Sequence, residues 1–231
     1  MMPLAIIRIL CLLPLLTTAL SASAAGTVEI PVQAGGPYAV PVISMKGMRF
    51  QSTIHQQYDF SCGSAALATL LTYHYNYPSS EQQIFREMYE RGDKEKVRKE
   101  GFSLLDIKNY LTAHGFKSDG YVAGVDKLVA AKIPAIALIK ERGYHHFVVI
   151  KGVRDGRVLI GDPSNGTRAV TETQFKQMSV SNILFVIKNK QDEARFNLAA
   201  DWRAAPGAPT GDAIYRGSAD HGFRKFGPTD F

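Results

Sequence analysis

A run of apolar, helix-compatible residues follows a short polar stretch in the first third of the chain. Residues 64–75 are rich in Ala and Leu and apolar on nearly all sides, which predicts a buried helix. The preceding residues 55–63 are polar and turn-like. The buried helix is therefore expected to begin close to Cys62.

More helices are expected after this one. The sequence of residues 80–83 has a capping-box pattern, which predicts a helix that runs to about Arg91. A charged loop is expected over residues 92–101. Apolar spacing and the stop signal of Gly115 predict a third helix over residues 103–115, and a short fourth helix is expected over 125–132.

Apolar runs bounded by turn residues predict strands in the rest of the chain. The predicted strands cover residues 45–53, 135–139, 146–153, 157–161 and 182–188, with a short helix over 172–178. Asp155-Gly156, between two of these strands, is a strong hairpin signal. Helices followed by a mostly antiparallel sheet form an α+β arrangement.

The two ends of the chain differ from its middle. Residues 1–24 carry one basic residue, Arg8, and a short apolar run broken by Pro14. This pattern, with small residues at its end, predicts a secretory signal peptide rather than a membrane anchor, which takes roughly 20 apolar residues. We expect cleavage after Ala24 or Ala25, a periplasmic or secreted product, and no stable membrane insertion.

The remaining length fits one domain. We expect an extended lead-in over residues 25–49 and one folded domain over residues 50–190. Residues 191–231 are polar, with several Gly and Pro, and are expected to form a tail that is poorly ordered or lies along the surface.

Charge and histidine placement exclude several classes of function. The formal charge is +6, but basic and acidic residues are mixed and no basic patch with aromatic residues is visible, so no nucleic-acid partner is expected. The histidines are scattered and form no set of metal ligands. We therefore expect neither a metal nor another cofactor.

Signal-peptide cleavage would remove Cys11 and leave Cys62 as the one cysteine. An unpaired thiol in an oxidising compartment is either reactive or buried and inert. Its place at the start of a helix favours the reactive alternative, because the helix dipole stabilises a thiolate. With an imidazolium nearby, the pKa of such a thiol falls below its usual value of about 8.5.

A candidate base for this thiol stands where a later strand begins, although a histidine at a strand end is more often structural. His146 opens that strand and His145 precedes it. Neighbouring strand residues point to opposite faces, so one of the two can face the cysteine. Asp162 ends the next strand and could orient the base, although Asp-Pro is also a common turn starter.

The hairpin loop decides whether His146 and Asp162 can meet. With Asp155-Gly156 alone as the loop, the two residues face opposite sides of the sheet. With a three-residue loop, residues 154–156, they share a face as diagonal neighbours. The pairing therefore predicts a three-residue loop, or an equivalent bulge near Gly161.

An oxyanion donor is expected before the cysteine. Gln56 lies six residues ahead of Cys62, and its side-chain amide could bind an oxyanion together with the Cys62 backbone amide. Gln57 is the competing candidate, and spacing does not separate the two.

Three motifs together resemble a known family. They are Gln56-x5-Cys62-Gly63-x-Ala65, His146-Phe147-Val148-Val149 and Asp162-Pro163. In this order they resemble the double-glycine leader peptidases, family thirty-nine of the cysteine peptidases, over residues 50–188. The resemblance implies a papain-like fold with amino-terminal helices packed on an antiparallel sheet, and a polypeptide substrate. It also implies Cys62 as nucleophile, His146 as general base, Asp162 as the residue that orients it and Gln56 as oxyanion donor.

The chain departs from the family pattern in two respects. Many members form the amino-terminal domain of a transporter, whereas this chain has no transporter helices, and Ser61 stands where the family often has Asp. Within the family it resembles standalone exported members, such as the peptidase-like component of functional-amyloid secretion systems. This resemblance implies an exported cysteine endopeptidase acting on an amyloid-system polypeptide. The alternatives are a non-catalytic peptide-binding module that assists secretion, and a cell-wall amidase.

Overall fold

A computed structural model gives the structure of the chain and describes residues 25–30 and 38–207. The predicted signal peptide and residues 208–231 lie outside the described residues. The chain forms two units, which divide after Ser44. In the first unit, β1 (Ala25–Ile30) pairs antiparallel with β2 (Tyr38–Ile43). The lead-in is thus a hairpin in its first part.

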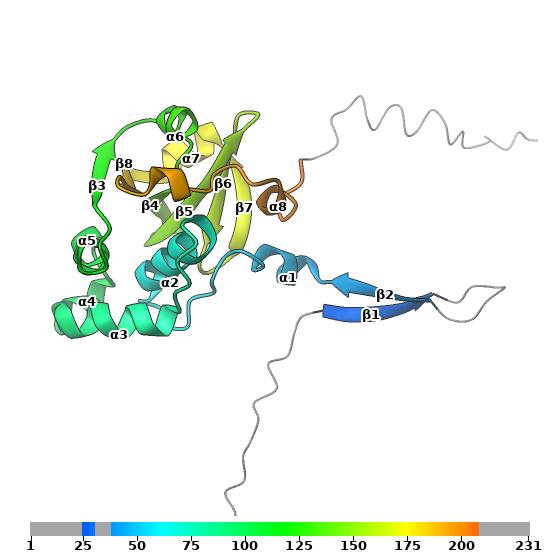
Figure 1. The fold of residues 1–231 in the computed structure, drawn as a ribbon, viewed down its shortest axis with the longest axis horizontal. Helices are drawn as coiled ribbons and strands as arrows, with labels where there is room; N and C mark the ends of the chain where they lie inside the picture. The colour runs from blue at the N-terminus through cyan, green and yellow to red at the C-terminus, as the bar shows by residue number, and fades with distance from the viewer. Residues whose placement is uncertain (1–24, 31–37, 208–231) are drawn as a thin grey trace, which may run out of the picture. The chain divides into compact units, whose positions relative to one another are not determined.

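The second unit contains a six-stranded antiparallel sheet of order β3-β8-β4-β5-β6-β7 (Figure 1). Its strands are β3 (Ser118–Val122), β4 (Ala135–Glu141), β5 (Tyr144–Arg154), β6 (Arg157–Asp162), β7 (Gly166–Thr171) and β8 (Ser179–Ile187). The predicted antiparallel sheet is confirmed.

Helices precede and interrupt this sheet. They are α1 (Met45–Arg49), α2 (Cys62–Thr69), the π-helix η1 (Leu70–His74), α3 (Glu81–Arg91), α4 (Lys94–Glu100), α5 (Leu104–Ala113), α6 (Asp126–Ala131), α7 (Glu172–Met178), the 3₁₀ helix η2 (Gln191–Glu193) and α8 (Ala199–Trp202). Side-chain caps fix the first residues of several helices. The Ser80 side chain accepts from the backbone N–H of Gln83, and Ser103 and Asp106 form a reciprocal capping box.

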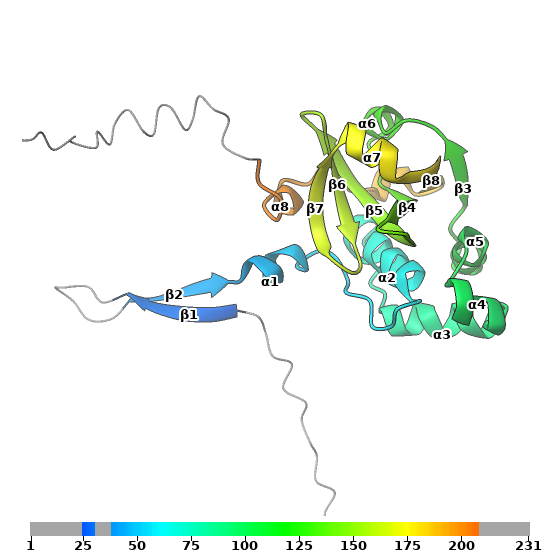
Figure 2. The ribbon, with the colours of Figure 1, turned by 180° about the vertical axis from the view of Figure 1, so that it is seen from behind.

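Both faces of the sheet are covered by helices. On one face, residues of α2, α3 and α5 pack against Phe147 and Val149 of β5. On the other face, Leu128 of α6 and Phe175 of α7 pack against Val148. Figures 1 and 2 show these helices on the two sides of the strands. The apolar run in β5 is therefore buried on both sides, which explains why it is continuous rather than alternating.

Two regions differ from the elements predicted from sequence. Residues 45–49 form α1 instead of a strand. The charged segment expected as a loop contains α4, whose N-cap Asp93 accepts from two backbone amides and whose Val97 is buried. Strands β3 and β7 were not predicted, because their residues are mostly polar or exposed and do not alternate.

The hairpin between β5 and β6 corrects the predicted loop. Arg154 pairs with Arg157, so the loop is the two-residue turn Asp155-Gly156, with both φ angles positive, as in a type I′ turn. The register then shifts between Ile150 and Gly152, which makes Lys151 the extra residue of a β-bulge. A bulge thus takes the place of the expected third loop residue.

The segment after residue 190 is packed against this bulge, which corrects the expectation of a poorly ordered or surface-lying tail for its first part. The Asn197 amide donates to the Lys151 carbonyl at 2.9 Å, an oxygen that the bulge removes from the regular ladder. A Cβ on Gly152 would lie 2.3 Å from Asn197 Oδ1, so glycine permits this close approach. Asp201 and Trp202 of α8 are buried.

Candidate functional site

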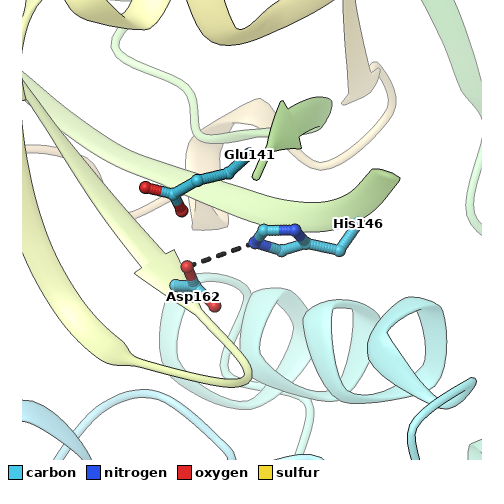
Figure 3. Close-up of side chains that lie close together, drawn as sticks. All are labelled: Glu141, His146 and Asp162. Carbon is cyan, nitrogen blue, oxygen red and sulfur yellow. Dashed lines mark hydrogen bonds and ion pairs between the residues drawn. The ribbon is translucent and has the colours of Figure 1, made fainter. Parts of the chain in front are cut away.

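The bulge brings the predicted base and its partner onto one face. Val149 pairs with Gly161, so the next residues, Val148 and Asp162, lie opposite each other and His146 is a diagonal neighbour of Asp162. His146 Nε2 lies 3.2 Å from Asp162 Oδ2 (Figure 3). His145 is exposed and opposite Lys140. The structure therefore gives the carboxylate contact to His146 and not to His145.

Asp162 is fully buried and well supplied with donors. Its Oδ1 accepts from the amides of Ser164 at 2.9 Å and Asn165 at 3.2 Å, and its Oδ2 accepts from Asn165 Nδ2 and Arg168 Nη2 at 3.1 Å each. Burial raises the pKa of the carboxyl, but the hydrogen bonds from His146 and Asn165 outweigh it and hold the pKa far below its usual range. Asp162 is therefore a carboxylate at all physiological pH values.

Glu141 completes a small charged cluster around this pair. Ligand atoms of Glu141, His146 and Asp162 all lie within 4.8 Å of one another (Figure 3). Arg168 Nη2 already binds both carboxylates, at 2.7 Å from Glu141 Oε2. A metal ion there would have to displace this guanidinium, so the cluster fits an ion-pair network better than a metal centre.

Cys62 is the first residue of α2, as predicted, and it is buried. Its pKa is raised above the usual value, because burial disfavours the thiolate more than the hydrogen bonds from the backbone of Phe147 and Gly63 favour it. The expected lowering of the Cys62 pKa is therefore wrong for this state, because desolvation is the largest effect on the thiol.

One backbone contact links the thiol to the strand that carries the candidate base. The Phe147 backbone that hydrogen-bonds the thiol follows His146 directly. Among the hydrogen bonds of the described residues, none joins the thiol to the His146 ring. Catalytic hydrogen bonds are commonly long before substrate binds, so this geometry is compatible with a thiol and base that close on each other later.

The two candidate glutamines are held differently. Gln56 Oε1 accepts from Ser164 Oγ at 2.9 Å, and the backbone N–H of Gln56 donates to the Pro163 carbonyl. Its side chain therefore lies at the turn that follows Asp162. Gln57 Oε1 accepts from Gln82 on α3. The structure thus ties Gln56, and not Gln57, to the Asp162 turn, while Gln56 Nε2 donates to the Tyr58 carbonyl at 3.0 Å.

An open cleft of about 390 Å³ lies beside His146. Its lining comes from α1, the β4–β5 turn and the β6–β7 turn: Arg49, Glu141, Arg142, Tyr144, His146, Ser164, Asn165 and Arg168. Of these residues, the sequence motifs had indicated His146. A separate hollow of about 710 Å³ between α6, α7 and β8 does not reach the site.

Comparison with known proteins decides the family of this site. The model of the Peptidase C39 family matches residues 51–191. The chain belongs to the Peptidase C39 family. A C39 peptidase is a cysteine peptidase, so the expected enzyme class is confirmed and the binding module and the amidase are not supported.

Two relatives extend the match beyond the motifs. The "Probable functional amyloid protease FapD" of Pseudomonas fluorescens is 39% identical over 167 residues, which cover 72% of this chain and 73% of that protein. The protein of the same name from Pseudomonas aeruginosa is 40% identical over 167 residues with the same coverage.

A solved structure supports the fold. The peptidase domain of Streptococcus ComA, described as a bi-functional ABC transporter, superposes with a TM-score of 0.50 at 20% sequence identity. The match covers 59% of this chain and 96% of that domain. The α+β fold of this C39 peptidase is therefore the one found in the ComA peptidase domain, and the predicted fold class is confirmed. None of the helices in residues 38–207 is long and apolar enough to cross a membrane.

Proposed function

We propose that this C39 peptidase is an exported endopeptidase that cleaves a polypeptide through Cys62, His146 and Asp162. The observation that carries the proposal is the contact between His146 Nε2 and the buried carboxylate of Asp162. His146 is next along the chain to Phe147, whose backbone hydrogen-bonds the Cys62 thiol. A nucleophile, a base and a group that orients the base are the parts that acyl transfer requires.

The Asp162 contact fixes the tautomer of the base. Since Asp162 is ionised, Nε2 of His146 carries a hydrogen and donates it to Oδ2. The lone pair of Nδ1 is then left to accept the proton of the Cys62 thiol. Asp162 also stabilises the imidazolium that results, without accepting a proton itself.

The reaction then has two steps. The Cys62 thiol gives its proton to His146 and its sulfur attacks the scissile carbonyl carbon. The imidazolium returns the proton to the leaving amine as the peptide bond breaks, which leaves a thioester on Cys62. A water molecule, deprotonated by His146, attacks the thioester and releases the acid and the free thiol.

We assign the oxyanion donor to Gln56. Its Nε2 carries two hydrogens, and one is donated to Tyr58. The other is left for the oxyanion, together with the Cys62 backbone amide at the helix start. Ser164 and Pro163 hold the Gln56 side chain and backbone, which supports a fixed position for this donor.

The relatives support a narrower assignment. Both bear the name of a functional amyloid protease, and residues 1–24 have the pattern of a secretory signal peptide. We infer that the enzyme works in the periplasm or outside the cell and that its substrate is a polypeptide of an amyloid-secretion system.

The Cys62→Ala variant tests this proposal. Purified enzyme is incubated with candidate exported polypeptides, amyloid subunits among them, and new chain ends are identified by mass spectrometry. We expect cleavage by the unaltered protein and none by Cys62→Ala, with unchanged circular dichroism. Cleavage that persists in the variant would refute the assignment of the nucleophile.

A further inference from the structure

We propose that the cleft beside His146 is a binding site for an acidic side chain, Asp or Glu, on the leaving part of the substrate. The inference rests on the proposed function and names a substrate preference for the same enzyme. It follows from three properties of the cleft: its charge, the way its arginines are held, and its place relative to the thiol.

The residues that line the cleft include more basic than acidic side chains. Three arginines line it, and Arg168 is bound to Glu141 and Asp162. Arg49 and Arg142 make no ion pair with any residue that the structure describes. Even with the buried Asp162 carboxylate counted, three guanidinium groups face two carboxylates, so the cleft has a net positive charge that favours a carboxylate.

The arginine on α1 is held at the cleft by close packing. Gly166, at the end of the β6–β7 turn, has φ +77°, and a Cβ placed on it would lie 2.7 Å from Cβ of Arg49. Glycine at this position therefore lets the backbone of Arg49 approach the turn. Arg142 lies in the β4–β5 turn and also lines the cleft. The two guanidinium groups thus come from separate elements, and packing against Gly166 fixes the backbone of the one on α1.

The position of the cleft assigns it to the leaving part of the substrate. Cys62 keeps the acyl part as a thioester, and His146 protonates the leaving amine. His146 lines the cleft and Cys62 does not. The substrate chain that begins at the leaving nitrogen therefore passes from the His146 ring towards the cleft. Three extended residues of that chain reach about 10 Å from the cut bond.

A library of peptides with amidated carboxyl ends tests the preference at whichever bond the enzyme cuts. Amidation removes the terminal carboxylate, so any preference must come from side chains. We expect Asp and Glu to be enriched roughly three- to tenfold within the first three residues after the cut bond. The enrichment should decrease at high salt, because the arginines are exposed to solvent.

Matched variants identify the residues responsible. The double variant Arg49→Gln/Arg142→Gln should lose the enrichment while it still cleaves neutral peptides. Lys140→Gln removes one positive charge from the opposite face of β4 and should keep the enrichment. Cleavage without enrichment, or enrichment that survives the double variant, would overturn the inference and leave the proposed function standing. Absence of any Cys62-dependent cleavage would refute both.

Discussion

At the scale of single residues, the protonation of Cys62 is the property that most affects the chemistry. Burial raises its pKa, and the backbone of Phe147 and Gly63 offsets only part of that effect. The resting enzyme therefore holds a neutral thiol. In the proposed mechanism, the thiolate forms by proton transfer to His146, whose Nδ1 is kept available by the Asp162 contact.

This protonation state predicts how the thiol reacts with iodoacetamide. Alkylation requires the thiolate, so the rate in the folded protein should be low at pH 7. The alkylation rate should rise about tenfold per pH unit, and it should level off at a pH above the usual thiol pKa of about 8.5. The rate is measured by mass spectrometry of the Cys62 peptide, with the urea-unfolded protein as control, whose curve should lie at lower pH. A rate that is already constant from pH 5 to 7 would show that the thiol is ionised at rest.

At the scale of secondary-structure elements, the bulge in β5 aligns the site. Lys151, the extra residue, is fully buried, and its Nζ donates to the Ser52 carbonyl at 2.8 Å and to Asp201 Oδ1 at 3.0 Å. Without the extra residue, His146 and Asp162 would face opposite sides of the sheet. Helix α8, which carries Asp201, therefore helps to hold the register that brings His146 to Asp162, from about 50 residues further along the chain.

Removal of one partner of this ion pair should be costly. Asp201→Ala leaves the Lys151 ammonium buried without its counter-charge, so we expect the free energy of unfolding to fall by about 3–5 kcal/mol. Lys151→Met combined with Asp201→Leu should regain most of that loss, since no buried charge remains. Urea denaturation measures both values.

The exposed Asp192, in the same segment, provides the control for this pair. Asp192→Ala should leave the free energy of unfolding nearly unchanged, within about 0.5 kcal/mol. If Asp201→Ala behaved like Asp192→Ala, the buried pair would not stabilise the bulge and the role assigned to α8 would be wrong.

Local sequence patterns could predict much of the fold and the ends of the strands that carry His146 and Asp162. The buried helix that begins at Cys62, the capped helices and the β5–β6 hairpin all leave signals within a few residues. The bulge leaves none, because it depends on contacts between Lys151 and residues far away in sequence. Glu141 and Arg168 were missed for the same reason: a single charged residue in a strand has no spacing that marks it.

One missed element did have a local signal. Asp93 caps α4, the acidic Glu95 lies in its first turn, and Arg98 and Lys99 lie in its last, an arrangement that favours a helix. The lack of apolar residues hid it, since Val97 alone is buried. Low apolar content therefore marks a surface helix as easily as a loop.

At the scale of the whole molecule, the second unit combines a sheet covered on both faces with a site at the ends of its strands. Helix α2 presents Cys62 to one end of β5, and the turns after β4 and β6 form the adjacent cleft. The segment 191–202 packs against the bulge. The match to the Peptidase C39 family ends at residue 191, and α8 lies beyond it.

The central claim is that His146, held by Asp162, is the base for Cys62. The most direct measurement is kcat/KM for a cleaved peptide in His146→Ala and, as a matched control, in His145→Ala. The account predicts a loss of roughly 10²–10⁴-fold for His146→Ala and an unchanged value for His145→Ala, whose side chain is exposed away from Asp162. Equal losses in the two variants, or full activity in His146→Ala, would contradict it.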